Sequence, residues 1–120
     1  MQSILVVEDE WAIADWLQAM LDDAGYRVFT ASNGRKALEL LAEHRPDLLI
    51  TDFMMPVMDG PALIRAVRQD GSSNIPVIVV SSLPEATVRE RIDGISGFLR
   101  KPFSEVDVLR LVSRSLEGGH

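Results

Sequence analysis

Short runs of apolar residues alternate five times with longer stretches of mixed character along this chain. The short runs are rich in valine, isoleucine and leucine, which is typical of β-strands, and they cover Ile4–Val7, Arg27–Ala31, Leu48–Thr51, Val77–Ser81 and Gly97–Arg100. In the stretches between them apolar residues recur every three or four positions, as in helices with one buried face. The pattern therefore predicts strand–helix units in series.

Several residues mark where the helices begin and end. Gly25 ends the first helical stretch, and Asn33 and Ser104 are expected to cap the second and the last. Pro61 suits the first turn of the third helix. The fourth stretch, between residues 83 and 94, contains few apolar side chains, so we expect its helix to be the least firmly packed.

Strands that alternate with helices form parallel sheets with helices on both faces. We therefore expect an α/β fold, namely a flavodoxin-like doubly wound (βα)5 domain whose five-stranded parallel sheet has the order 2-1-3-4-5. The strand–helix units occupy residues 1–116. Residues 117–120 would then form a short tail that need not belong to the natural protein.

The composition narrows the range of functions. The chain has 120 residues and a net charge of −6, without a cluster of basic residues that could bind a run of phosphates. It contains no cysteine, which excludes disulfide bonds and thiolate metal sites. Its longest apolar run is far shorter than a membrane span. We therefore expect a cytoplasmic protein with no direct contact to nucleic acid or membranes.

Polar residues follow the predicted strands, where binding sites of such sheets form. Glu8 and Asp9 follow the first strand, Asp52 follows the third, Ser81 ends the fourth, and Lys101 follows the fifth. In the order 2-1-3-4-5 the first and third strands are neighbours, so the carboxylates converge. Carboxylates this close require a cation between them, and a few oxygen ligands open to water suit Mg²⁺.

These residue types fit phosphoryl transfer. Mg²⁺ and Lys101 together balance the charge of the carboxylates, so the pocket can accept an anionic phosphoryl group. A carboxylate can act as the nucleophile, and Asp52 is the candidate because it lies between the acids of the first strand and the Ser81 and Lys101 side. Ser81 would donate a hydrogen bond to a phosphoryl oxygen, and Lys101 would act as a point charge.

Four segments, taken together and in this order, resemble the receiver domain of bacterial two-component response regulators. They are Val7–Asp9, Asp52–Gly60, Ser81 and Phe98–Phe103. The resemblance covers nearly the whole chain and implies a phosphorylation-controlled signalling switch. Such a switch catalyses only its own phosphorylation and dephosphorylation and is otherwise not an enzyme.

The resemblance also assigns the acceptor and the metal ligands. It implies that Asp52 is the phospho-acceptor. Asp9, Asp52 and the backbone carbonyl of Met54 would bind Mg²⁺, and Glu8 would bind it through water. The cofactor that follows from the resemblance is therefore Mg²⁺, as the carboxylates alone already indicate.

The remaining site residues form the expected switch. By resemblance, Ser81 and Lys101 contact the phosphoryl group, and Phe98 turns inward when Ser81 is drawn toward that group. The bond between Lys101 and Pro102 is often cis in this family. The surface around the fourth helix, the fifth strand and the fifth helix would change as a result.

Expected partners follow from the same resemblance. A histidine kinase or a histidine phosphotransfer protein would donate the phosphoryl group, and the output would go to a downstream protein or to an effector domain outside this sequence. A homodimer would use the fourth helix, the fifth strand and the fifth helix. Trp11, Pro102 and Phe103 are candidates for a partner surface, although a packed Trp11 is an equal alternative, and Trp16 is expected to pack.

Alternative readings remain open at this point. The chain could be a degenerate receiver that binds proteins independently of phosphorylation. It could be a Mg²⁺-dependent phosphohydrolase, although haloacid dehalogenase-type enzymes need a second aspartate where Met54 stands. A flavodoxin-type cofactor carrier would need a Gly/Ser/Thr-rich first loop instead of Glu8–Glu10. Taken singly, Asp9 could be a helix cap, and Asp52 with Asp59 and Gly60 could be turn residues.

Overall fold

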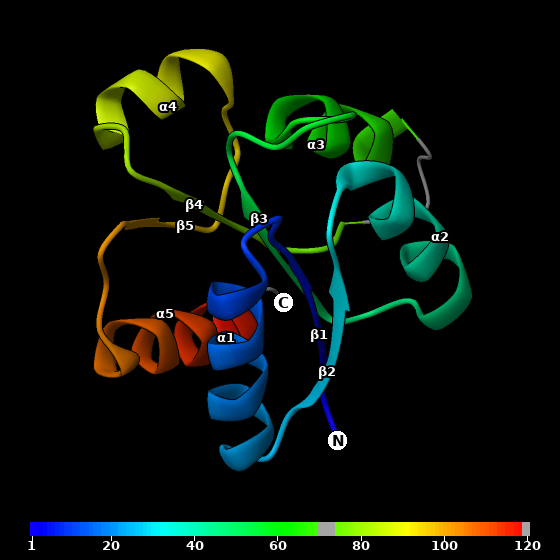
Figure 1. Ribbon diagram of the computed structural model, residues 1–120, viewed down its shortest axis with the longest axis vertical. Coiled ribbons are helices and arrows are strands. Elements are labelled where there is room, and N and C mark those ends of the chain that lie inside the picture. The colour runs from blue at the N-terminus through cyan, green and yellow to red at the C-terminus, as the bar shows by residue number, and fades with distance from the viewer. Residues whose placement is uncertain (70–73, 119–120) are drawn as a thin grey trace.

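The computed structural model describes residues 1–69 and 74–118 (Figure 1). The strands in these ranges are β1 (Ser3–Val7), β2 (Arg27–Ala31), β3 (Leu48–Asp52), β4 (Val77–Ser81) and β5 (Gly97–Arg100). The helices are α1 (Trp11–Asp23), α2 (Gly34–His44), α3 (Gly60–Gln69), α4 (Glu85–Arg91) and α5 (Glu105–Gly118). The strands are parallel in the order β2-β1-β3-β4-β5, which confirms the predicted fold and places β2 and β5 at the edges.

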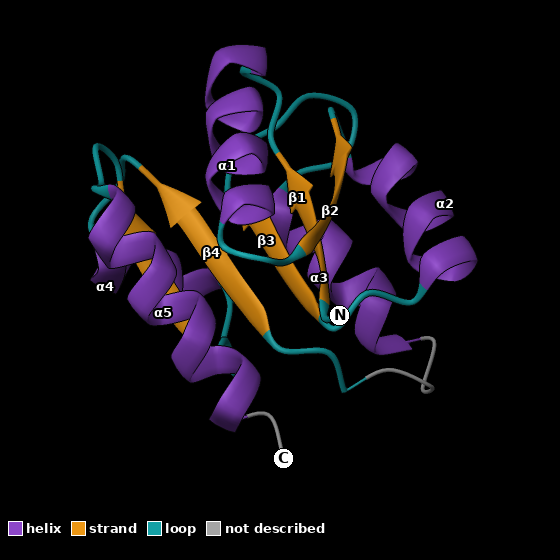
Figure 2. Cartoon of the chain, turned by 90° about the horizontal axis from the view of Figure 1, so that it is seen from below, coloured by secondary structure: helices purple, strands orange, loops and turns teal. Residues whose placement is uncertain are grey.

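Helices cover both faces of the sheet and give the molecule three layers (Figures 1 and 2). Successive side chains of β1 point to opposite faces: Ile4 lies in the core beneath α1 and α5, and Leu5 lies in the core beneath α2, α3 and α4. The inner strands β3 and β4 are buried at every position, which explains their unbroken apolar sequence.

Capping residues fix the starts of three helices. The side chain of Asn33 accepts a hydrogen bond from the Lys36 N–H at 2.9 Å, and Ser104 accepts one from the Asp107 N–H at 3.2 Å, which confirms both predicted caps. Asp59 caps α3 by accepting from the Ala62 N–H at 3.0 Å. α1 begins after Glu10 without a side-chain cap, so the alternative reading of Asp9 as its cap was wrong.

α4 is the shortest helix in the described part of the chain, and it is shorter than the predicted stretch. It covers only residues 85–91, and Val88 is its one buried residue. This confirms the expectation of a thinly packed fourth helix. An element with so little buried apolar surface is free to change position at low energetic cost.

The carboxyl-terminal helix extends beyond the predicted end of the domain. α5 continues through Glu117 to Gly118, while the expected tail residues Gly119 and His120 lie outside the described residues. None of the described helices is long and apolar enough to cross a membrane.

Replacing Ser115 by alanine is expected to stabilise the protein. Ser115 lies in α5, and within the described ranges its buried hydroxyl has no hydrogen-bond partner. Removing an unsatisfied buried polar group gains about 1 kcal/mol, and the better helix propensity of alanine adds about 0.5 kcal/mol. Ser113, exposed on the same helix, provides the matched control because Ser113→Ala gains only the propensity part. Equal free energies of unfolding for the two variants in urea would contradict the prediction.

Candidate functional site

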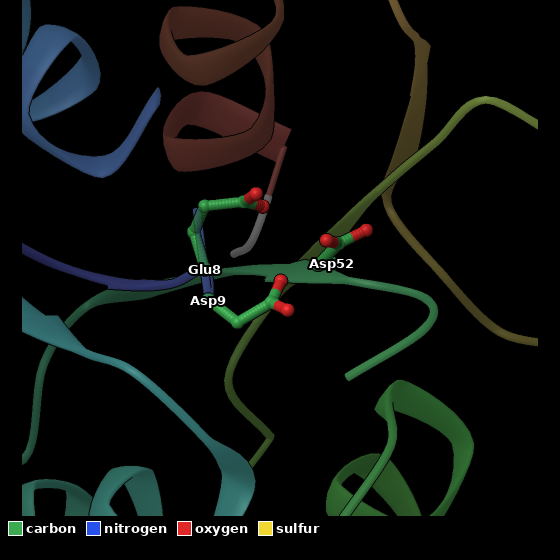
Figure 3. A group of neighbouring side chains, drawn as sticks. All are labelled: Glu8, Asp9 and Asp52. Atoms are coloured by element: carbon green, nitrogen blue, oxygen red, sulfur yellow. The ribbon is translucent and has the colours of Figure 1, made fainter. Parts of the chain in front are cut away.

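The acidic residues meet at the carboxyl edge of the sheet, as predicted from the strand order. β1 and β3 pair directly, so Glu8 and Asp9 after β1 lie next to Asp52 at the end of β3 (Figure 3). One oxygen from each carboxylate lies within 4.8 Å of the others. Glu8 and Asp52 are buried, whereas Asp9 is exposed. The cluster therefore has a closed side within the protein and an open side toward solvent.

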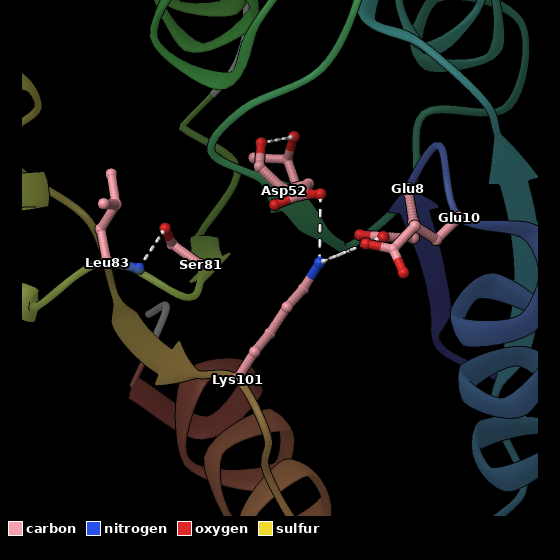
Figure 4. Close-up of polar contacts among 7 residues, drawn as sticks. Glu8, Glu10, Asp52, Ser81, Leu83 and Lys101 are labelled. Atoms are coloured by element: carbon pink, nitrogen blue, oxygen red, sulfur yellow. Dashed lines mark hydrogen bonds and ion pairs between the residues drawn. The ribbon is translucent and has the colours of Figure 1, made fainter.

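Lys101 reaches this cluster from the end of β5 and bridges its two buried acids (Figure 4). Its Nζ lies 3.2 Å from Glu8 Oε1 and 3.3 Å from Asp52 Oδ2. A third carboxylate, that of Glu10, approaches Nζ to 3.6 Å. The predicted meeting of Lys101 with Glu8 and Asp52 is confirmed, whereas the contribution of Glu10 was missed. One ammonium group cannot balance this many carboxylates, so the cluster retains a negative charge that attracts a further cation.

Burial and charge shift the proton affinities of two groups. Burial, followed by the negative charge of Asp52, raises the pKa of Glu8 from 4.5 to about 7, although Lys101 opposes this shift. Burial lowers the pKa of Lys101, but attraction to Asp52 and Glu8 outweighs it and leaves that pKa above its ordinary value. Lys101 therefore remains charged at neutral pH.

The raised pKa of Glu8 predicts a specific pH dependence of stability in EDTA. The folded protein keeps the Glu8 proton up to about pH 7, whereas the unfolded chain releases it near 4.5. The stability that this group contributes is therefore complete below pH 4.5 and is lost as the pH rises through 7. The loss reaches up to about 3 kcal/mol.

Glu8→Gln, which cannot ionise, should melt at a higher temperature than wild type at pH 8 and at a similar temperature near pH 4.5. Thermal unfolding followed by circular dichroism in EDTA measures the difference. Glu10→Gln is the control, because Glu10 is mostly exposed and also contacts Lys101. An advantage of Glu8→Gln that stays constant across this pH range would contradict the prediction.

Three further predicted site residues, Ser81, Phe98 and Met54, differ in their burial and contacts. The buried Ser81 hydroxyl oxygen accepts a hydrogen bond from the Leu83 N–H at 3.0 Å, so it faces Leu83 (Figure 4). Phe98 on β5 is half-buried against the core beneath α3 and α4. The side chain of Met54, two residues after Asp52, is 65% exposed. The Lys101–Pro102 bond is cis.

The loop between β3 and α3 holds Asp52 through close backbone contacts. The Gly60 N–H donates to the carbonyl of Phe53 at 2.9 Å. A Cβ on Gly60 would lie only 2.6 Å from the Asp52 carbonyl oxygen, so a side chain cannot be placed here without moving the strand end. Val57 has a φ of 72°, and the Met58 N–H closes a tight turn around it onto the Pro56 carbonyl. The sequence had suggested only a turn at Asp59 and Gly60.

Exposed aromatic and apolar side chains lie near the start of α1 and the end of β5. Trp11 is 79% exposed, so the alternative prediction that its side chain packs in the protein interior was wrong. Pro102 is exposed and Phe103 is half-buried. Trp16 is 41% exposed, less enclosed than expected, and its ring lies 5.8 Å from that of Phe103.

The comparison with known proteins agrees with this geometry. The sequence model of the family described as "Response regulator receiver domain" matches residues 4–113 of this chain. The chain is 38% identical to the sensor histidine kinase TmoS of Ectopseudomonas mendocina, over 92% of this chain and 12% of that protein. It is 37% identical to the response regulator MprA of Mycolicibacterium vanbaalenii, over 88% of this chain and 46% of that protein. The chain thus spans less than half the length of these relatives.

Solved structures give the same result. The chemotaxis response regulator CheY4 of Vibrio cholerae superposes with a TM-score of 0.89 and 33% identity, over 96% of this chain and 98% of that chain. The receiver domain of a sensor histidine kinase from Pseudomonas aeruginosa, solved with a magnesium ion coordinated in its active site cleft, superposes with a TM-score of 0.87 and 29% identity, over 97% of this chain and 98% of that chain. The chain belongs to the response regulator receiver domain family, whose members act as signalling switches in two-component systems.

Proposed function

We propose that this receiver domain is switched by transfer of a phosphoryl group to Asp52. The observation that carries the proposal is the joint position of the three carboxylates and Lys101: their oxygens lie within 4.8 Å of one another, and Nζ bridges Glu8 and Asp52 at 3.2 and 3.3 Å. This arrangement supplies a nucleophile together with a fixed positive charge beside it.

The donor set fits Mg²⁺. All side-chain ligands are carboxylate oxygens, and the exposed position of Asp9 leaves room for water and for a phosphoryl oxygen. We assign Asp9, Asp52 and the Met54 carbonyl as direct ligands, and Glu8 as a ligand through water. When bound, the ion supplies positive charge that offsets the carboxylates and the phosphoryl oxygens. The magnesium ion in the related Pseudomonas receiver supports this assignment.

The transfer itself is a displacement at phosphorus. An oxygen of Asp52 forms a bond to phosphorus while the bond between phosphorus and the histidine nitrogen of the donor breaks, and that nitrogen takes up a proton. Lys101 places a positive charge next to the phosphoryl oxygens. The product is an aspartyl phosphate on Asp52.

The switch uses Ser81 and Phe98. The Ser81 hydroxyl now accepts from the Leu83 N–H, and its own proton is available for a phosphoryl oxygen once the side chain turns toward Asp52. Phe98 is half-buried on β5, two residues before the position that pairs with Ser81, and moves inward to fill the space. Because α4 buries only Val88, it can follow this movement at low cost.

The proposed partners match the surfaces around the site. A histidine kinase or a histidine phosphotransfer protein donates the phosphoryl group and docks on Trp11, Pro102 and Phe103 beside the acidic cluster. A downstream protein, an attached effector domain or a second copy of the chain reads the surface of α4, β5 and α5. The chain catalyses only its own phosphorylation and dephosphorylation.

Intact-mass measurement after incubation with phosphoramidate tests the proposal. We expect the mass of one phosphoryl group to be added in Mg²⁺ and none in EDTA. No gain in Mg²⁺ would favour a receiver that acts only by binding, and a gain unaffected by EDTA would contradict the metal assignment. Continuous release of phosphate in large excess over protein would indicate a phosphohydrolase instead.

A further inference from the structure

A second hollow lies beside the acceptor site, between the β3–α3 loop and α4. It has a volume of about 330 Å³ and shares two residues, Asp9 and Met54, with the proposed metal site. Arg91, from the last turn of α4, also lines this hollow. Among the described residues that line this hollow, Arg91 is the only one with a positive charge.

The guanidinium of Arg91 is not paired with a carboxylate in the part of the chain that the structure describes. Its guanidinium lies 5.4 Å from the centre of the Phe53 ring, and within residues 1–69 and 74–118 it forms no ion pair. The neighbouring arginines differ in this respect, because Arg89 pairs with Glu85 at 2.6 Å and Arg68 pairs with Asp93 at 3.6 Å. Phe53 is buried directly after Asp52, so its ring holds the guanidinium close to the acceptor loop.

An in-line displacement places the leaving group on the side of phosphorus away from the attacking Asp52 oxygen. The hollow adjoins the proposed metal site at Asp9 and Met54 and is open to solvent at the exposed Met54 side chain, so we place the leaving group in it, beside Arg91. A guanidinium there stabilises a leaving group that develops negative charge, through a bidentate charge-assisted hydrogen bond. It does little for a leaving group that departs as a neutral amine.

We propose that Arg91 makes this receiver selective for acyl phosphates among small phosphoryl donors, an inference that rests on the function proposed above. With an acyl phosphate, the Asp52 oxygen forms its bond to phosphorus and the bond from phosphorus to the acyl oxygen breaks. The electron pair stays on that oxygen, and a carboxylate leaves without needing a proton. With a phosphoramidate, the phosphorus–nitrogen bond breaks, and the nitrogen takes up a proton and leaves uncharged.

The test compares the two donor classes on the full chain with Mg²⁺. Acetyl phosphate and phosphoramidate are supplied at equal ionic strength, and the rate of mass gain is measured for each. For Arg91→Gln, we expect the ratio of the acetyl phosphate rate to the phosphoramidate rate to fall by about three- to tenfold relative to wild type. For Arg91→Lys, the ratio of the two rates should lie between those of wild type and Arg91→Gln, because lysine keeps the charge but loses the bidentate geometry.

Arg89→Gln is the matched control, since Arg89 lies on the same helix but does not line the hollow. Its rate ratio should equal that of wild type. An unchanged ratio in Arg91→Gln, or the same fall in Arg89→Gln, would overturn the assignment of Arg91 while leaving Asp52 as the acceptor. If neither donor added mass to wild type, the proposed function itself would fail.

Discussion

Replacing Asp52 by asparagine is expected to abolish phosphorylation of this domain. Asp52 is the proposed nucleophile, and its carboxylate lies between the metal-side acids and Lys101 Nζ at 3.3 Å. An amide in its place is a poor nucleophile and removes one charge from the cation site. We expect the rate of mass gain with phosphoramidate and Mg²⁺ to fall by about three orders of magnitude or more.

Asp59→Asn serves as the control for this experiment. Asp59 lies in the same loop but caps α3, a role that asparagine fills equally well. This variant should gain mass at nearly the wild-type rate. A phosphoryl group that is still added to the Asp52→Asn variant at the wild-type rate would place the acceptor elsewhere in the chain.

The second large effect is expected for Lys101→Met. Methionine keeps most of the apolar stem but leaves Glu8 and Asp52 without the ammonium group that now bridges them. Removing one partner of a buried ion pair costs about 3 kcal/mol or more, because the remaining charge stays buried without a counter-charge. The free energy of unfolding in EDTA should therefore fall by this amount. Mg²⁺ should restore much of the loss, because it supplies positive charge to the same carboxylates.

Urea unfolding with EDTA and with saturating Mg²⁺ measures both effects. Lys36→Met, which changes the chain's other lysine at an exposed position of α2, should leave stability nearly unchanged in both conditions. If Lys101→Met lost the same stability with and without Mg²⁺, the role of Lys101 would be one of packing alone. In Mg²⁺, Lys101→Met should also accept phosphoryl groups more slowly than wild type.

Much of the fold could be predicted because it is encoded locally. The apolar runs of β3 and β4 predict strands buried on both faces. Asn33 and Ser104 mark helix starts through hydrogen bonds to residues only three positions further along the chain. The cluster of Glu8, Asp9 and Asp52 could be predicted as well, since the strand order alone brings the ends of β1 and β3 together.

The features that could not be predicted depend on contacts across space. Nothing in the sequence around Gly60 shows that a Cβ there would meet the carbonyl of Asp52 at 2.6 Å. The approach of Glu10 to Lys101 depends on how α1 starts, and the position of Arg91 over Phe53 depends on where the short α4 lies. Each of these is set by the packing of elements, which single-sequence periodicity does not describe.

The edge strands of the sheet have a consequence for self-association. β2 begins with exposed Arg27, and β5 has only four residues and ends with exposed Arg100. A neighbouring chain that added its own strand to either edge would have to desolvate a guanidinium for a short ladder of backbone hydrogen bonds. The charged edges thus oppose open-ended growth of the sheet into fibrils.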